Sequence, residues 1–342
     1  MKLLITGGAG FIGSNFIKYV LDNNSDVEVI NLDKLTYAGN LDNVAHLESN
    51  KRYSFVKGDI CDKALLNQLF TENNIEGIIH FAAESHVDNS INNPGIFVET
   101  NVKGTYALLE AARAHWMDAP FTYKKGFENT RFHHISTDEV YGSLGKEGLF
   151  TEKTPYAPNS PYSATKAASD FLVRSYHHTY GMNVVTTNCS NNYGPYQNDE
   201  KLIPTIIRKA LSQEPIPIYG DGQNIRDWLY VEDHCIGLDL VFKKGSAGET
   251  YNIGGNNEYT NLEIAQKICE ILDEEFPLKQ TSYQDLITFV TDRPGHDFRY
   301  AIDASKIEKE IGWKPNESFD TGIRKTIKWY LAKYKKLKTA TK

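Results

Sequence analysis

Cysteine is scarce in this sequence, and no long hydrophobic run occurs in it. The four cysteines lie far apart and form no C-x-x-C pair: Cys61, Cys189, Cys235 and Cys269. This spacing excludes a disulfide framework and offers no zinc or redox motif. No stretch approaches about 18 apolar residues, and the opening MKLLITGGAG reaches glycines too early for a signal-peptide core. We therefore expect no membrane span, reduced thiols and a cytoplasmic location.

Basic residues are outnumbered by acidic ones, 37 Lys and Arg against 44 Asp and Glu, for a formal net charge of −7. Five lysines fall in the last ten residues, 333–342, which contain no acid, so the body of the chain is more acidic still. Binding along a nucleic-acid backbone needs a basic surface, so no nucleic-acid partner is expected. The Lys-rich tail at 331–342 is predicted to be a solvated terminus, with an electrostatic tether as the alternative.

The chain of 342 residues, 40% hydrophobic and 24% charged, is long enough for about two globular domains. Its first part alternates short apolar runs with helical patterns. The predicted strands are 3–6, 27–32, 53–57, 77–81, 131–136 and 183–188, and the clearest predicted helices are 11–21, 102–115 and 162–180. This alternation predicts an α/β fold, with a Rossmann-type, doubly wound parallel sheet covered by helices on both faces.

The regular alternation ends after Tyr193. The patterns that follow are a helix at 203–211, strands at 216–219 and 227–231, a helix at 232–242 and a strand at 251–253. The last of these strands can rejoin the first sheet. We therefore predict a first domain at 1–193 with return segments near 224–256, and a smaller α/β domain at 194–330.

Glycines mark the junction between the first strand and the first helix. Gly7, Gly10 and Gly13 stand at G-x-x-G-x-x-G spacing. One glycine permits the tight turn, one lets the backbone approach a pyrophosphate, and one allows close helix packing, while the helix N-terminus supplies N–H groups. Asp33 ends the second strand, where a carboxylate binds both hydroxyls of an adenosine ribose and repels a 2′-phosphate. The pattern predicts NAD rather than NADP.

Small and acidic residues also follow the third and fourth strands. Asp59 and Ile60 come after the third, and Ala82, Ala83 and Glu84 come after the fourth. Because ligands of doubly wound sheets bind outside the carboxyl ends of the strands, these residues are expected to line the same cofactor site.

A tyrosine and a lysine stand four residues apart in the predicted helix 162–180. This spacing places Tyr162 and Lys166 on one face of the helix. A phenol has a pKa of about 10, and a neighbouring ammonium lowers that pKa by favouring the phenolate. Downstream of a dinucleotide motif, the pair is predicted to accept and return a substrate proton.

Together, the glycine motif and the Tyr-x-x-x-Lys pair resemble the extended short-chain dehydrogenase/reductase superfamily, and the resemblance covers nearly the whole chain. The discriminating segment within it is ISTDEVYG at 135–142. Related sugar-nucleotide epimerases need only a hydroxyl residue there. Here Thr137 is followed by two carboxylates, Asp138 and Glu139, a run that resembles the motif of the dTDP-glucose 4,6-dehydratase family.

The resemblance implies a specific reaction on dTDP-glucose. Oxidation of the sugar at C4 acidifies the C5 hydrogen, water then leaves from C5 and C6, and NADH returns the hydride to C6. Glu139 is the implied base at C5 and Asp138 the implied acid at C6, while Thr137 hydrogen-bonds the C4 oxygen and Tyr162 takes its proton. An adjacent pair of acids needs unequal environments for this division of roles.

Binding residues follow from the same resemblance. The implied cofactor-binding residues beyond those named from the strand ends are Phe11, Ile12, Lys34, Leu35, Thr36, Thr100, Asn192 and the catalytic Tyr162 and Lys166. The implied substrate-binding residues are Ser85, His86, Thr137, Asn191, Lys201, Leu202, Pro217, Ile218, Tyr219, Arg226, Asn261, Asp292, Arg293, Pro294, Gly295 and His296. A homodimer is implied as well, formed by the helices at 102–115 and 162–180, with the first domain binding NAD and the second the nucleotide sugar.

Two other interpretations stay open at this point. One is an NAD-dependent epimerase, or a dehydratase of another nucleotide sugar. The other is a non-catalytic dinucleotide sensor, whose expected mark is the loss of Thr137, Tyr162 or Lys166; all three are present. No metal is expected, because the pairs His133-His134 and His177-His178 are adjacent and point apart on a strand or helix.

Overall fold

A seven-stranded parallel sheet forms the centre of the computed structural model, which describes residues 1–292 and 296–340. Its strand order is β12-β8-β7-β4-β1-β2-β3. The strands are β1 (Lys2–Thr6), β2 (Glu28–Asp33), β3 (Tyr53–Lys57), β4 (Gly77–His80), β7 (Arg131–Thr137), β8 (Val184–Cys189) and β12 (Thr250–Ile253). The predicted α/β, Rossmann-type fold is confirmed, and so is the return of the strand near 251–253 to the first sheet.

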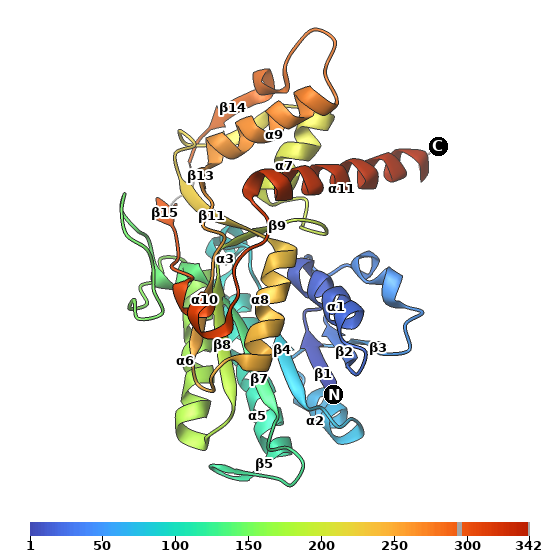
Figure 1. Cartoon of the computed structure of the whole chain (residues 1–342), viewed down its shortest axis with the longest axis vertical. Helices are drawn as coiled ribbons and strands as arrows, with labels where there is room; N and C mark the ends of the chain where they lie inside the picture. The colour runs from blue at the N-terminus through green and yellow to red at the C-terminus, as the bar shows by residue number, and fades with distance from the viewer. Residues whose placement is uncertain (293–295, 341–342) are drawn as a thin grey trace.

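Helices cover both faces of this sheet (Figure 1). One face packs against α1 (Phe11–Asn23), α8 (Val231–Lys244) and α10 (Ser305–Ile311), and the other against α2 (Lys63–Glu72), α5 (Thr105–Trp116) and α6 (Pro161–Tyr180). Strands buried on both faces need apolar side chains at nearly every position, which explains the continuous apolar runs in the sequence. The strand order reverses between β1 and β4, so a crevice for a ligand opens at their carboxyl ends.

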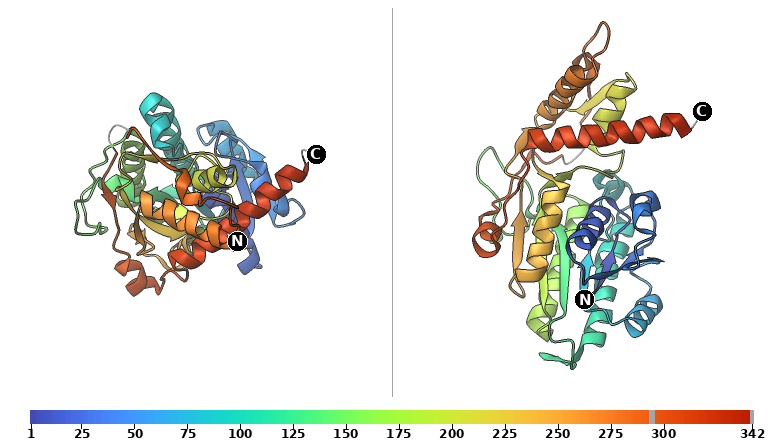
Figure 2. Two further views of the ribbon diagram at one scale, coloured as in Figure 1. Left: turned by 90° about the horizontal axis from the view of Figure 1, so that it is seen from above. Right: turned by 45° about the vertical axis from the view of Figure 1, so that its right-hand side comes forward.

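A smaller group of elements lies above the carboxyl ends of the sheet (Figures 1 and 2). Its strands are β9 (Asn191–Tyr193), β10 (Ile216–Tyr219), β11 (Ile225–Tyr230), β13 (Glu258–Thr260), β14 (Ile287–Val290) and β15 (Arg299–Tyr300), and its helices are α7 (Leu202–Leu211), α9 (Asn261–Glu275) and α11 (Phe319–Ala340). These helices share a separate hydrophobic core with β10 and β11. After β8 the chain leaves the large sheet. It enters the smaller part at Asn191, where β9 begins and pairs with β11.

Short elements connect the main ones. They are the helices α3 (Val87–Asn92) and α4 (Pro94–Phe97), the strands β5 (Met117–Ala119) and β6 (Thr122–Tyr123), the 3-10 helices Leu41–Asn43, Ala45–Leu47, Asp138–Tyr141 and Tyr283–Leu286, and a π-helix at Val98–Gly104. The predicted helix at 102–115 therefore starts within π-helical backbone. Among the helices of the described residues, none is long and apolar enough to cross a membrane.

Candidate active site

A cavity of about 310 Å³ lies at the carboxyl ends of the sheet strands. Most residues predicted for the cofactor and the chemistry line it: Gly7, Gly10, Phe11, Ile12, Gly13, Asp33, Lys34, Thr36, Asp59, Ile60, Ala82, Ala83, Glu84, Thr100, Asn192, Thr137, Asp138, Glu139, Tyr162 and Lys166. Four predicted substrate residues also line it: Ser85, His86, Asn191 and Lys201. The fold thus brings the two predicted sets together in one place.

The glycine turn has the close packing that a dinucleotide cradle needs. Gly7 has a φ of +72°, and a Cβ there would lie 2.6 Å from the backbone nitrogen of Ala82. A Cβ on Gly13 would lie 2.4 Å from the Gly7 carbonyl oxygen. Gly10 is less crowded, since its Cβ would meet a single atom, at 3.2 Å, and α1 begins directly after it without a side-chain cap. The uncapped N–H groups at the cavity wall therefore fit a pyrophosphate.

Asp33 is held ready for a ribose by two backbone donors. The nitrogen of Ala9 donates to Oδ2 at 2.9 Å and that of Leu35 to Oδ1 at 2.8 Å. Burial raises the pKa of the Asp33 carboxyl, while these donors lower it. Leu35 does not line the cavity; its backbone orients Asp33. Next to Asp33, Lys34 Nζ lies 2.7 Å from Asp59 Oδ2 and joins the ends of β2 and β3.

The Thr-Asp-Glu run leaves the end of β7 and opens a 3-10 helix. The Thr137 hydroxyl caps this helix by accepting from the Glu139 nitrogen at 3.3 Å, and it lies 3.4 Å from Asp138 Oδ1 as a donor. Asp138 is 1% exposed, and its Oδ2 has no hydrogen-bond partner among the described residues. Burial, then Glu139 and Asp227, raise the pKa of Asp138 well above its ordinary value. The protonated form of Asp138 is therefore favoured, beside a half-buried Glu139.

Tyr162 and Lys166 enter the cavity from the first turns of α6. This helix is fixed at its start by a capping box between Ser160 and Ser163 and by Pro161. Burial, followed by Glu139, raises the pKa of Tyr162 well above 10, although a hydrogen bond with Thr137 lowers it. The pKa of Tyr162 is therefore shifted upward by desolvation, and the sequence-based prediction of a lowered pKa is wrong.

Lys166 is itself perturbed by burial. Its ammonium donates to the Ile135 carbonyl oxygen at 2.7 Å. Burial lowers its pKa to about 8, opposed by Asp170 and then Cys189.

The remaining predicted substrate residues lie in the smaller part of the structure. They do not line the cavity: Leu202, Pro217, Ile218, Tyr219, Arg226, Asn261, Asp292 and His296. The Arg226 guanidinium is buried, donates to the Asp297 carbonyl oxygen at 3.0 Å, and lies 4.3 Å from the centre of the Tyr300 ring. Asp292 and His296 contact each other at 2.7 Å. Arg293, Pro294 and Gly295 lie outside the described residues.

Two loops that sequence reasoning missed close over the cavity. Tyr37 and Gly39 line it from one side, and Gln197 and Asn198 from the other. The Asn198 side-chain amide reaches the Tyr37 carbonyl oxygen at 3.5 Å. The turn-forming residues around positions 38–40 and 194–198 indicate loops, but no sequence pattern indicates that these two loops lie side by side.

Metal-binding residues do not cluster in the described parts of the chain, where no three His, Cys, Asp or Glu side chains are placed to share an ion. His133 and His134 point to different partners, as predicted, whereas the prediction is wrong for His177 and His178, whose ring centres lie 5.2 Å apart. His133 Nε2 contacts Thr187 at 3.1 Å, whereas His134 Nε2 lies 3.1 Å from Asp170.

Comparison with known proteins returns nucleotide-sugar dehydratases. The family described as GDP-mannose 4,6 dehydratase matches residues 4–326. The dTDP-glucose 4,6-dehydratase of Xanthomonas campestris pv. campestris (strain B100) is 57% identical over 329 residues, which are 96% of this chain and 92% of the relative. The structure of dTDP-glucose 4,6-dehydratase from Bacillus anthracis str. Ames in complex with NAD has a TM-score of 0.85 and 46% identity over 97% of each chain. DesIV, the dTDP-glucose 4,6-dehydratase of Streptomyces venezuelae solved with NAD bound, has a TM-score of 0.86 and 46% identity over 97% of each chain.

Proposed function

Since the chain belongs to the dTDP-glucose 4,6-dehydratase family, we propose a role for each group of cavity residues in the reaction of that family. The enzyme uses NAD and converts dTDP-glucose into dTDP-4-keto-6-deoxyglucose and water. The observation that carries the assignment of roles is a buried Asp138, with a raised pKa, beside a half-buried Glu139 in a cavity that Tyr162 also lines.

Oxidation at C4 falls to Thr137, Tyr162 and Lys166. Bound NAD supplies the acceptor for the C4 hydride and returns that hydride to C6. Tyr162 takes the proton of the C4 hydroxyl, and Thr137 hydrogen-bonds the same oxygen. The positive charge of Lys166 favours the phenolate of Tyr162, against the desolvation that raises its pKa.

Elimination of water falls to the two carboxyl groups. Glu139 removes the C5 hydrogen, which the C4 ketone has acidified. Asp138 gives its proton to the departing C6 hydroxyl. The structure supports this division physically, because only a group protonated at neutral pH can act as the acid, and burial keeps Asp138 in that form.

Binding of the rest of the substrate is assigned to the residues at and above the cavity mouth. Ser85, Asn191 and Lys201 are proposed to contact the sugar and the diphosphate. The predicted nucleotide-binding residues on β10, β11 and α9 belong to the smaller part of the structure, which lies above the carboxyl ends of the large sheet (Figure 1). We propose the division into a first domain at 1–193, with return segments near 224–256, and a second at 194–330, because the cavity residues and the nucleotide-binding residues fall in different parts of the structure.

Relatives favour this function over the alternatives. The family description names GDP-mannose, whereas the full-length relatives at 57% identity act, by their names, on dTDP-glucose. Incubation with dTDP-glucose is expected to give a 4-keto sugar, detected by its absorbance in alkali. UDP-glucose and GDP-mannose in parallel test the choice of base. A folded, NAD-loaded protein that gives no keto sugar from dTDP-glucose contradicts the proposal.

A homodimer and a cytoplasmic location complete the proposal. Large apolar side chains are exposed on the outer faces of the π-helix, α5 and α6, where Val98 is 46%, Tyr106 40% and Phe171 58% exposed. A second copy of the chain can bury these exposed apolar side chains, and their exposure therefore supports a two-fold dimer through α5 and α6. The free state of all four cysteines agrees with a reducing compartment. Light scattering of the purified enzyme tests the dimer.

A further inference from the structure

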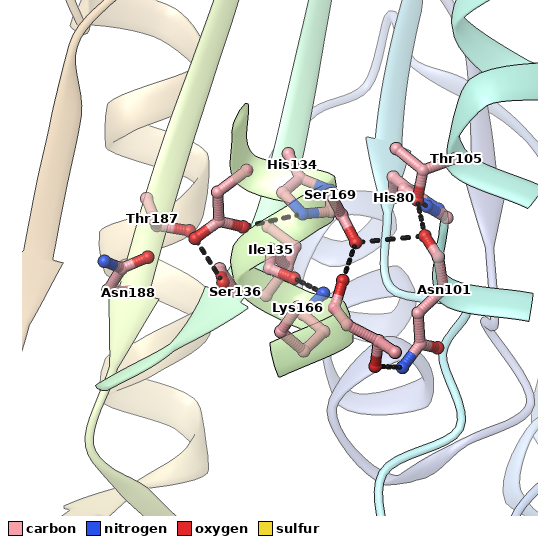
Figure 3. Close-up of polar contacts among 12 residues, drawn as sticks. His80, Asn101, Thr105, His134, Ile135, Ser136, Lys166, Ser169, Thr187 and Asn188 are labelled. Carbon is pink, nitrogen blue, oxygen red and sulfur yellow. Dashed lines mark hydrogen bonds and ion pairs between the residues drawn. The ribbon is translucent and has the colours of Figure 1, made fainter. Parts of the chain in front are cut away.

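Asp170 is a buried carboxylate that the proposed reaction does not use. It lies on α6 one turn after Lys166 and is 5% exposed. Its Oδ2 accepts hydrogen bonds from the Ser136 hydroxyl and from the Tyr156 hydroxyl, both at 2.9 Å. Its Oδ1 lies 3.1 Å from His134 Nε2. Figure 3 shows Ser136 and His134 beside Lys166 in this cluster. The hydrogen bonds from Ser136 and Tyr156 therefore fix the position of this carboxylate.

The ammonium of Lys166 needs a counter-charge at this depth. Lys166 is 4% exposed, and its ammonium donates to a neutral group, the Ile135 carbonyl oxygen, at 2.7 Å. A buried ammonium without an anion nearby loses its proton, because desolvation disfavours the charged form. Retention of the proton therefore depends on which surrounding group carries negative charge.

The groups packed around Lys166 come from α6, β4, β7, β8 and the 3-10 helix after β7. They are Tyr162 and Asp170 on α6, His80 on β4, His134 on β7, Cys189 on β8, and Asp138 and Glu139 on the 3-10 helix. Burial keeps both histidines neutral by lowering their pKa, and raises the pKa of the Cys189 thiol to about 12. Burial raises the pKa of Asp138 and so favours its neutral form. Glu139 faces Tyr162 and raises the pKa of that phenol.

Asp170 is thus the carboxylate placed to balance Lys166. Burial raises its pKa to about 6, while Lys166, Ser136 and Tyr156 lower it. It is therefore ionised at neutral pH.

We propose that Asp170 is a positioning residue for the dehydratase reaction: its carboxylate, held by Ser136 and Tyr156, keeps Lys166 protonated and thereby keeps Tyr162 able to take the C4 proton at neutral pH. The proposal rests on the roles assigned above to Tyr162 and Lys166. It adds a residue that contacts neither the substrate nor the cofactor and acts through Lys166.

The test is the pH profile of C4 oxidation in Asp170→Asn. Removal of the anion lowers the pKa of the ammonium, so the alkaline fall in rate is expected to begin about one pH unit lower than in the wild type. Asp170→Glu keeps the charge and is expected to restore the profile. Tyr156→Phe removes a donor to Asp170 but leaves the carboxylate ionised at the pH of the alkaline limb, so that limb is expected to stay.

A matched control separates this effect from a loss of stability. Asp233 on α8 is also buried, at 2% exposure, and its carboxylate accepts from the Glu317 nitrogen at 2.9 Å, away from the cavity. Asp233→Asn is expected to lower the melting temperature without moving either limb. An unmoved alkaline limb in Asp170→Asn, or a limb that Asp170→Glu fails to restore, overturns the proposal.

Lys166→Met distinguishes a failure of the proposed function from a failure of the role proposed for Asp170. Full activity in Lys166→Met contradicts the proposed function itself. An inactive Lys166→Met together with an unmoved limb in Asp170→Asn contradicts the role of Asp170 alone. If Asp170→Asn does not fold, Asp170→Ser, which is smaller and also uncharged, is measured instead: an unmoved alkaline limb overturns the proposal, and a limb at lower pH supports it.

Discussion

Replacement of Asp138 by asparagine separates the two halves of the proposed reaction. Asp138 is 1% exposed and its raised pKa favours the neutral carboxyl, so the substitution replaces it by a neutral amide of nearly equal shape. The change leaves no uncompensated charge, and the fold is expected to tolerate it. The amide cannot release a proton to the departing C6 hydroxyl. A missing general acid slows its step by about 100-fold or more.

Oxidation at C4 does not use the proton of Asp138. Its rate is therefore expected to stay within about fivefold of the wild type, since a factor of five corresponds to only about 1 kcal/mol. The reduced nicotinamide is then formed at nearly normal speed and persists, because its hydride can return to C6 only after water has left. Asp138→Asn should accumulate this reduced form, which the wild type consumes quickly.

Single-turnover absorbance at the NADH band measures both steps in one trace. The rise reports oxidation, and the decay reports elimination followed by return of the hydride. Glu139→Gln serves as a comparison, because loss of the C5 base also blocks elimination. Equal slowing of the rise and the decay in Asp138→Asn would refute the reasoning, since Asp138 would then serve binding or C4 oxidation.

Three further predictions follow from the cavity. Gly13→Ala is expected to lower both the melting temperature and the amount of bound NAD, because its Cβ would lie 2.4 Å from the Gly7 carbonyl oxygen. Gly10→Ala makes only one contact, at 3.2 Å, and should fold normally but lose NAD. Equal melting temperatures of the two variants would count against this packing. Asp33→Ser is expected to narrow the preference for NAD over NADP at least tenfold in binding assays, and an unchanged ratio contradicts the role of its carboxylate. The wild-type rate of C4 oxidation should fall above about pH 8, where Lys166 loses its proton, and a rate that keeps rising to pH 10 contradicts the need for the ammonium.

Much of the fold could be predicted from local patterns. The apolar runs of β1, β2 and β4 signal strands because parallel strands are buried on both faces. The glycine turn could be located because its spacing serves a local purpose, the approach of a backbone to a pyrophosphate. Tyr162 and Lys166 share a helix face, so their spacing alone places them together.

Long-range packing set the features that could not be predicted. Tyr37 and Asn198 meet across the cavity mouth although their segments carry no shared pattern. The pKa of Tyr162 rises because of its depth in the fold, which spacing does not report. Asp170 is one of many acids in the sequence, and only its contacts with Ser136 and Tyr156 distinguish it.

The fate of the C4 hydrogen tests the central claim most directly. We expect dTDP-glucose labelled with deuterium at C4 to give a keto sugar that carries the deuterium at C6 of the same molecule, because the hydride leaves C4 and returns to C6 within one active site. Mass spectrometry of a mixture with unlabelled substrate should show no exchange between molecules. Deuterium that returns to C4 of an inverted sugar, or that is lost to water, would contradict the account.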